Sequence, residues 1–344
     1  MHYVSRFFYA FFLIIGINSL SAQNTQAAVD YMSTMNEHLG DIKGETWRYL
    51  KAATQGKSAR RVESKRQQLI SELQDVRSNI SKTSTFEGDP NLRDEALNYL
   101  GLTITVIKGD FEKILDMEEI AERSYDDMEA FLLAKDLANA KLDSAAEIFS
   151  KAQTDFAARN NITLVEGEQS KRDEKIAKAS KALKYYNEIY LITFKATVQE
   201  SYVLDALNRN DLISLEQSTN ALDLAAKEGL EKLKTAEKFG SDPKLILAAQ
   251  QLMEFYSLEA SRDFPKIVDF YLRKDKFDKL AAMMETKKQK DLTQEEVDAY
   301  NQAVNDYNKM IPQFNTLTER SNEKRGQMLD RWNKRVEEFF EIHA

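Results

Sequence analysis

Apolar residues recur three and four positions apart from Thr25 onward, which is the spacing of one face of an α-helix. The clearest stripe steps by four residues from Tyr186 to Tyr202, and others run through Leu69–Ile80 and Phe131–Phe149. Glu, Lys, Asp and Gln occupy the opposite faces. No six-residue stretch alternates apolar and polar residues with β-branched enrichment, so the pattern predicts an all-α fold with essentially no sheet.

Breaks in these stripes are few, and each contains turn-forming residues. At Phe86–Pro90, Asp89 can cap free N–H groups while Pro90 takes the first helical position, where a missing donor costs little. A kink is expected at Lys108–Asp110. The remaining breaks are Gly56–Ser58, Asn160–Gly167, Arg209–Asp211, Gly240–Pro243 and Ile311–Thr318.

The segments between the breaks are long enough for extended helices. Glu168–Asn208 contains no breaker, so it is predicted to form one helix about 60 Å long at 1.5 Å per residue. The other predicted helices of the first half, and the last helix of the chain, are Ala27–Gln55, Ser58–Thr85, Pro90–Arg123, Tyr125–Asn160 and Thr318–Phe340.

The second half of the chain repeats features of the first. A shift of 153 places Phe86, Asp89 and Pro90 on Phe239, Asp242 and Pro243, with 10 identities over the 31 positions 86–116. Chance gives about two. Weaker matches continue at nearby shifts: Tyr31 with Tyr185 at 154, Tyr125-Asp126 with Phe277-Asp278 at 152, and Asp155-Phe156 with Asp306-Tyr307 at 151.

This repeat is too long for a solenoid unit and indicates a duplicated domain. We therefore expect two tandem homologous antiparallel bundles of about four helices each, elongated and joined by a long shared helix. The predicted divisions are a signal peptide (1–22), a first bundle (23–166), the connecting helix with the second bundle (167–317), and a C-terminal helix (318–344).

The first 22 residues have the layout of a secretory signal peptide. Arg6 gives a short positive start, Phe7–Ile17 is apolar, and small or polar residues from Asn18 lead to a predicted cut after Ala22. The apolar run is too short for a permanent membrane span, so a retained anchor is the less favoured alternative. We expect an exported protein, periplasmic or on the cell surface, with no integral span after cleavage.

Composition agrees with export and with helices. The chain has no cysteine, 11 glycines and 4 prolines, against about 24 glycines and 17 prolines for average usage. Lack of cysteine excludes disulfides, thiolate metal sites and cysteine nucleophiles. The net charge of −8, which becomes −9 without Arg6, argues against nucleic acid as a partner.

Searching for catalytic or cofactor motifs gives no candidate. Of three histidines, His2 belongs to the signal peptide and only His38 and His343 remain, without the spacing of zinc or di-iron motifs. His38 is expected to be an exposed helix residue. Serine-hydrolase, Walker and dinucleotide motifs are absent too. We therefore predict a non-enzymatic protein with no cofactor, and no catalytic, metal or cofactor-binding residues are assigned; the binding residues stay unknown.

Charged clusters are interpreted as solvated helix faces or helix ends. Thr293 and Glu296 have the spacing of a capping box. Lys287–Lys290 is expected to be an exposed turn. The acidic groups weighed are Glu118, Glu119 and Glu122; Asp126, Asp127 and Glu129; and Glu295, Glu296 and Asp298; the basic group is Lys57, Arg60, Arg61, Lys65 and Arg66, with Glu63.

Aromatic residues have the spacing of core stripes, although a tyrosine-lined groove for a glycan or peptide is the alternative. The sets concerned are Trp47 and Tyr49; Tyr185, Tyr186, Tyr190 and Phe194; Phe255 and Tyr256; Phe264, Phe270 and Tyr271; and Trp332, Phe339 and Phe340.

The segment Phe86–Ala96, with an exported start ending Ser-Ala-Gln, resembles an uncharacterised family of bacterial surface proteins described from spirochaetes and also found in Bacteroidetes. The resemblance would cover most of the chain after the signal peptide. It implies a helical architecture and an envelope or surface location. That family has no assigned activity, so no site residue is carried over.

Together these observations predict an exported envelope or surface protein that binds or scaffolds a protein or envelope partner through helical grooves. The alternative is a periplasmic helical protein that binds a ligand or metal through clustered carboxylates or tyrosines. A hydrolase is the least supported function, and the oligomeric state is left open.

Overall fold

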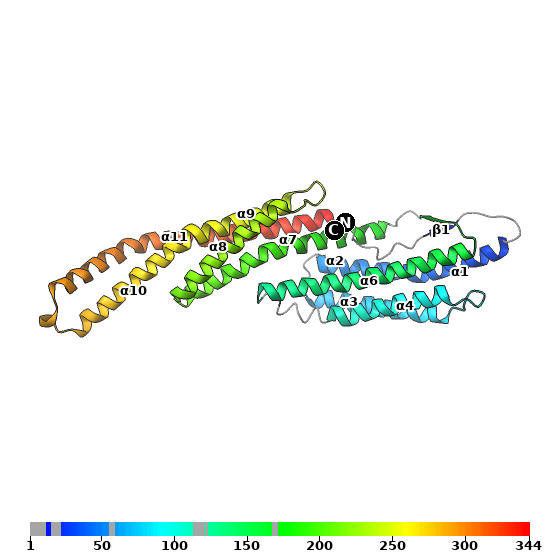
Figure 1. Cartoon of the computed structure of the whole chain (residues 1–344), viewed down its shortest axis with the longest axis horizontal. Helices are drawn as coiled ribbons and strands as arrows, with labels where there is room; N and C mark the ends of the chain where they lie inside the picture. Colours follow the sequence, from blue (N-terminus) through cyan, green and yellow to red (C-terminus); the bar gives the residue numbers. More distant parts are fainter. Residues whose placement is uncertain (1–11, 15–21, 55–58, 113–120, 122, 167–170) are drawn as a thin grey trace. The chain divides into compact units, whose positions relative to one another are not determined.

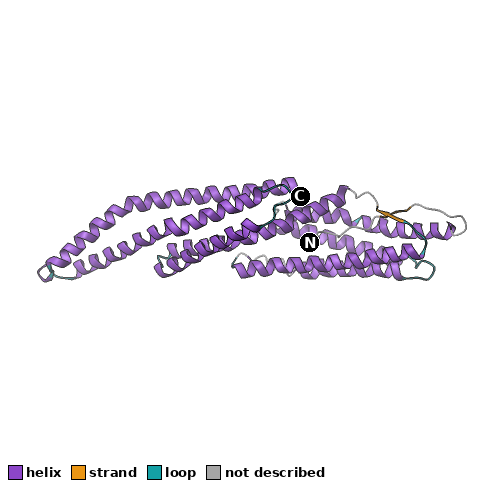
Figure 2. Ribbon diagram, turned by 45° about the horizontal axis from the view of Figure 1, so that its top comes forward, coloured by secondary structure: helices purple, strands orange, loops and turns teal. Residues whose placement is uncertain are grey.

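The protein is described by a computed structural model, which covers residues 12–14, 22–54, 59–112, 121, 123–166 and 171–344. Helices make up almost all of this, as Figure 2 shows, so the predicted all-α class is confirmed. The helices are α1 (Ala22–Gly40), α2 (Ile42–Thr54), α3 (Ala59–Lys82), α4 (Asn91–Thr105), α6 (Tyr125–Arg159), α7 (Lys171–Asn208), α8 (Leu212–Thr235), α9 (Lys244–Leu258), α10 (Phe264–Thr286) and α11 (Gln294–His343).

Short elements complete the described chain. Two five-residue π-helices, η1 (Val106–Asp110) and η2 (Glu259–Asp263), follow α4 and α9, and one 3₁₀ turn, η3 (Gln289–Asp291), precedes α11. Strand β1 (Phe12–Ile14) pairs antiparallel with β2 (Leu164–Glu166), a small exception to the predicted lack of sheet. Most of the predicted signal peptide lies outside the described residues, as do Gly56–Ser58 and Glu118, Glu119 and Glu122.

Contacts divide the chain into two compact units, and α7 and α11 each contribute to both. Unit 1 comprises Met1–Asn187 and Glu337–Ala344, and unit 2 comprises Glu188–Val336. In unit 1, α4 packs between α3 and α6, and α2 packs on α3 (Figure 1). In unit 2, α8 packs along α9 and also reaches η2 and α10.

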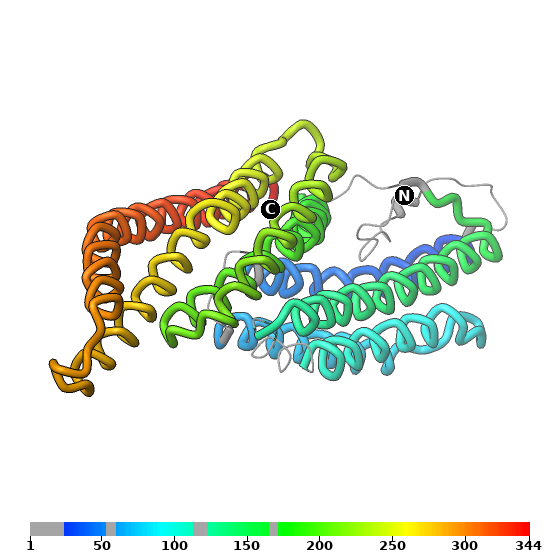
Figure 3. Tube along the Cα trace, turned by 60° about the vertical axis from the view of Figure 1, so that its left-hand side comes forward, coloured from blue at the N-terminus to red at the C-terminus, as the bar shows by residue number. Residues whose placement is uncertain are grey.

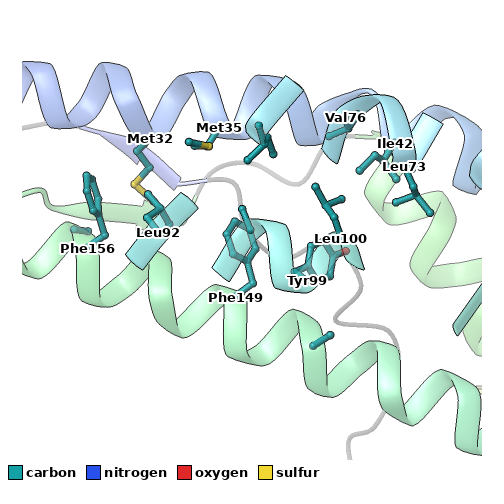
Figure 4. Packing of buried hydrophobic residues seen from close by; sticks show 14 of the residues in the cluster. Met32, Met35, Ile42, Leu73, Val76, Leu92, Tyr99, Leu100, Phe149 and Phe156 are labelled. Atoms are coloured by element: carbon teal, nitrogen blue, oxygen red, sulfur yellow. The ribbon is translucent and has the colours of Figure 1, made fainter. Parts of the chain in front are cut away.

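Unit 1 has a core of apolar side chains from α1, α2, α3, α4 and α6, methionine, leucine and aromatic residues among them. Met32 and Met35 of α1, Leu73 of α3 and Leu100 of α4 are all fully buried in this cluster (Figure 4). Tyr99 stacks on Phe149 of α6 with ring centroids 5.5 Å apart. Helices of this length owe most of their stability to such packing rather than to propensity, which is why the apolar stripes located them.

Several local features recur 153 residues along the chain. The bounds of α3, α4 and η1 shifted by 153 give those of α8, α9 and η2. The turns before α4 and α9 also match, since Phe86 bridges Asp89 and Phe239 bridges Asp242. Asp89 and Asp242 each accept a hydrogen bond at 2.9 Å from the backbone N–H two residues on. The prediction that Asp89 binds a free N–H at the start of this helix is confirmed, whereas Pro90 is the N-cap residue rather than the first helical residue, because α4 begins at Asn91.

An aromatic pair recurs with similar geometry. The rings of Tyr31 and Phe156 are 5.7 Å apart with planes at 35°, and those of Tyr185 and Phe339 are 5.7 Å apart at 34°. Tyr307, which the sequence shift of 151 aligned with Phe156, packs on Phe270 and Phe277.

Other predicted boundaries also need correction. Ala27–Gln55 is not one helix, because α1 ends at Gly40 and α2 begins at Ile42. No break occurs at Ile311–Thr318, since α11 continues through Pro312 to His343. Pro312 lacks one backbone donor, and the stacking of Phe314 on Phe270 next to it offsets that loss. At Lys108–Asp110, where a kink was predicted, the backbone departs from a regular α-helix and forms η1.

Candidate functional site

Of the acidic groups singled out in the sequence, the two that lie in the described residues are at the starts of α6 and α11. In α6, Ser124 is the N-cap and accepts a hydrogen bond from the Asp127 backbone N–H at 3.1 Å. At α11, Glu296 N donates to Thr293 Oγ1 and Thr293 N donates to Glu296 Oε2, so the predicted capping box is confirmed. Within the described ranges no group of three or more His, Asp or Glu side chains could hold a metal ion.

The two remaining histidines lie apart. His38 is half-buried in the last turn of α1 rather than fully exposed. His343 ends α11 and lies 5.0 Å from the ring of Phe339.

Arg66 is not on a solvated face, contrary to the prediction for its basic cluster. It is only 3% exposed and pairs with Glu63 at 2.7 Å. Its guanidinium donates to the carbonyl oxygens of Ile107 at 2.8 Å and Lys108 at 3.3 Å. A π-helix displaces carbonyls from the regular ladder, so Arg66 satisfies acceptors that η1 leaves open.

Most of the aromatic sets are core, as predicted. Tyr256, Phe264 and Phe339 are almost completely buried. Each unit also holds one tryptophan: Trp332 of unit 2 is 6% exposed, and half-buried Trp47 of unit 1 lies under Lys175, whose Nζ is 5.8 Å from the ring centroid.

Sequence reasoning missed a cluster of buried charges around η2 in unit 2. Glu200 of α7 and Glu259 of η2 are 4% and 1% exposed, and the guanidinium of Arg325 of α11 donates to both. One part-buried cation thus joins three elements. A π-helix aims side chains that a regular helix would place elsewhere, and such segments are frequent at functional sites.

A second ion group adjoins this one. Asp263, 5% exposed, accepts from Arg262 at 2.9 Å and from Arg320 of α11 at 3.3 Å. Tyr256 adds a hydroxyl 3.4 Å from Thr197 Oγ1. Glu259 Oε2 is buried without a hydrogen-bond partner among the described residues.

Burial raises the pKa of Glu259 to about 8, against a usual 4.5. Arg325 opposes this rise, while the carboxylates of Glu200 and Asp263 add to it. Burial, followed by Glu200, likewise raises the pKa of Tyr256 far above its usual range. At neutral pH Glu259 is therefore a neutral acid, and Arg325 balances Glu200. The cluster clamps α11 to η2 and α7 through buried ion pairs, and each available cation is engaged by a carboxylate.

One signal in the sequence could have located this cluster. The 153-residue shift aligns Glu259 with Val106, so an acidic residue in the second half of the sequence corresponds to an apolar residue in the first half. A charged residue in an otherwise apolar register is buried only with a partner. The partner Arg325 is 66 residues away along the chain, and nothing in the pattern joins the two.

The second feature of unit 2 is a two-helix arm, defined as residues 271–313. The hydroxyl of Ser257, at the end of α9, donates a hydrogen bond to Asp223 of α8, and the two helices run antiparallel. Counting backwards along α8 and forwards into α10 from this bond, the start of α8 lies level with Phe270. Beyond that level α10 and the first part of α11 run on to the turn at η3 (Figure 3). Of the arm's residues only Ala303 is buried.

An aromatic ladder holds the arm together. Phe270 stacks on Phe314 with centroids 4.0 Å apart, and Phe277 stacks on Tyr307 at 5.1 Å. Each rung is seven residues from the next on both helices, as in an antiparallel coiled coil. The inward positions are Ile267, Phe270, Lys274, Phe277, Ala281 and Met284 of α10, and Tyr300, Val304, Tyr307, Ile311 and Phe314 of α11.

The arm also has apolar residues outside this seam. Leu280 of α10 and Ala303 and Met310 of α11 occupy the positions directly beside it, one heptad apart on α11. A seam of two positions in seven suffices for two helices, whereas three in seven is typical of helices that pack in a larger bundle. Leu272, on the outer side of α10, is 52% exposed.

Charges on the arm are separated by helix. The segment 271–293 carries seven Lys or Arg and four Asp or Glu, including the exposed turn of Lys287, Lys288 and Lys290. The segment 294–313 carries one Lys and four Asp or Glu. The segment 271–293 therefore carries a net charge of +3 and the segment 294–313 a net charge of −3.

Comparison with known proteins finds no family model, no curated protein and no solved structure that the chain matches. Within the described residues, no helix is both long and apolar enough to cross a membrane.

Proposed function

We propose that the protein is an exported, non-enzymatic component of the bacterial envelope that binds or scaffolds partners through helical surfaces. The observation that carries the proposal is the arm, a two-helix seam with the further apolar residues Leu280, Ala303 and Met310 directly beside it. Such a face is stabilised when a further helical layer covers it. The layout of residues 1–22 supports export.

The proposal includes a tandem duplication. It is supported by the recurrence of α3, α4 and η1 as α8, α9 and η2 at one spacing, and by the matching ring pairs of Tyr31 and Tyr185. On this view the second copy kept the bundle and gained the longer arm. The resemblance to bacterial surface proteins carried by Phe86–Ala96 agrees with an envelope location and stays part of the proposal.

The test uses a photo-crosslinking amino acid at Leu280 in cells that produce the full chain. We expect covalent adducts with envelope protein at this position, and none when the same group replaces Leu133, which is 57% exposed on α6. Mass spectrometry of the exported protein should give Gln23 as its first residue. Equal labelling at both positions, or a chain retained in the cytoplasm, would contradict the proposal.

The second candidate is a helical ligand- or metal-binding protein. Acidic side chains from α7 and η2 do converge, in Glu200, Glu259 and Asp263, but Arg325 balances Glu200, Arg320 pairs with Asp263, and Glu259 is itself neutral. Loss of thermal stability on adding a chelator to the purified protein would favour this candidate over scaffolding. An unchanged melting temperature would argue against it.

A further inference from the structure

We infer that the arm is a self-association surface on which the arm of a second copy of this chain docks, forming an antiparallel four-helix bundle. The inference rests on the binding role proposed for the arm and adds the identity of its partner. It depends on the arm's apolar face, its charge separation and its register.

The apolar face defines where the second arm would lie. Leu280 and Met310 flank the seam on one side, and the sulfur-containing residues Met283 and Met284 are half-buried near the tip. Methionine side chains adapt to an opposing surface without a fixed shape. A second hairpin on this face would convert a two-helix seam into a four-helix core.

The charges define which partner fits. In a two-fold dimer whose axis runs parallel to the arms, each α10 lies between the two α11 helices, and both tips point the same way. The basic segment 271–293 of one copy then faces the acidic segment 294–313 of the other, twice by symmetry. A net of three charges on one side meets the opposite three on the other, so the arm is complementary to itself.

Register identifies the charges that lie at the same level along the arm. The rungs Phe270–Phe314 and Phe277–Tyr307 give a constant antiparallel register, which places Lys279 level with Asp306 and Lys288 level with Asp298 within two residues. Adjacent helices in the dimer keep this antiparallel direction. The same opposite charges would therefore lie at matching levels on neighbouring helices of the two copies.

The test is analytical ultracentrifugation of the full exported chain with two charge-reversed variants. Variant A carries Lys279→Glu and Lys288→Glu, and variant B carries Asp298→Lys and Asp306→Lys. We expect a dimer of the wild type, at least about 10-fold weaker self-association of A and of B, and restored association when A and B are mixed. Reversing Lys151 and Asp155 of α6, an exposed pair in unit 1, is the matched control and should change nothing.

Several outcomes would overturn the inference: a wild type that stays monomeric at all concentrations, a dimer unaffected by A and B, or a mixture that does not associate. Circular dichroism of each variant separates loss of folding from loss of docking. If the wild type is monomeric while Leu280 still crosslinks to another envelope protein, the proposed function stands and only self-association fails. If neither crosslinking nor dimerisation involves the arm, both proposals fail.

Discussion

Arg325 is the residue on which the buried charges of unit 2 depend. It is 12% exposed and donates to the Glu200 carboxylate and to the protonated carboxyl of Glu259, both of which are buried. A buried ion pair adds little net stability compared with apolar residues of the same volume. Removing only one partner is different, because the other charge stays buried without compensation.

Replacing Arg325 with Met should therefore lower the free energy of unfolding by about 3–5 kcal/mol. Urea denaturation followed by circular dichroism measures this directly. Arg331→Met is the control, since Arg331 is exposed on the same helix and bonds only to Gln251 at 3.0 Å. Similar losses for the two variants would show that Arg325 does not clamp α11.

Glu259 should make stability fall as pH rises. Its pKa in the folded protein, about 8, is above the unfolded value of 4.5, so the folded state binds the proton more tightly. The stabilisation is complete below pH 4.5 and is lost as pH rises towards 8, by up to about 1.4 kcal/mol per pH unit. The groups facing Glu259 are Glu200, Tyr256, Asp263 and Arg325.

Glu259→Gln removes this proton and should flatten the dependence of the urea midpoint on pH between 5 and 8. Asp143→Asn is the comparison, because burial also raises the pKa of Asp143 but in unit 1. A wild-type midpoint that stays constant or rises over this range would rule out a neutral buried Glu259.

At the scale of elements, the arm should be the least stable described part of unit 2. It buries one residue, whereas α9 buries eight. Local opening free energies follow buried contacts, so amides in 271–313 should exchange with deuterium before those of α8 and α9. Mass spectrometry of peptides from these segments makes the comparison. Dilution to low protein concentration should widen the difference if a second arm protects the first.

Pro312 offers a second test of the same element. Its side chain is exposed, and the residue cannot donate to the helix ladder of α11. Pro312→Ala should restore that bond and slow exchange in 294–313 by the equivalent of about 1–3 kcal/mol. Gln313→Ala is the control. Faster exchange in Pro312→Ala would show that α11 needs the proline.

Periodicity predicted the elements well where one face is buried along the whole length. Tyr125–Asn160 and Glu168–Asn208 correspond closely to α6 and α7 because an apolar stripe runs through each. The break at Asp41 was missed because residues on both sides of it continue the stripe, with Met35 and Ile42 both buried. The break expected at Pro312 is absent because packing of Phe314 on Phe270 outweighs the missing donor.

The cluster of buried charges around η2 was harder to predict because its residues are far apart in sequence. It is formed by three elements, which contribute Glu200, Glu259 and Arg325, and the sequence around each one alone predicts an ordinary exposed charge. Arg66 was misjudged for a similar reason: its acceptors are backbone carbonyls that exist only because η1 departs from a regular helix. Pattern arguments detect neither kind of partner.

At the scale of the whole molecule, both units contain a π-helix at the matching position but differ in the arginine that binds it. In unit 1 the cation that binds the π-helix η1 is Arg66, which comes from α3. In unit 2 it is Arg325, from α11, and the residue at the position of Arg66 is Thr219. The position of the π-helix is thus kept while its partner has changed.

The two tryptophans of the chain make this difference measurable. Trp47 lies in unit 1 and Trp332 in unit 2, within two turns of Arg325 on α11. Each unit therefore has its own intrinsic fluorophore, and Trp47→Phe or Trp332→Phe leaves emission from only one. We expect Arg325→Met to shift the emission transition of Trp332 to lower urea and leave that of Trp47 in place. A common shift of both would mean that the two cores unfold as one cooperative body.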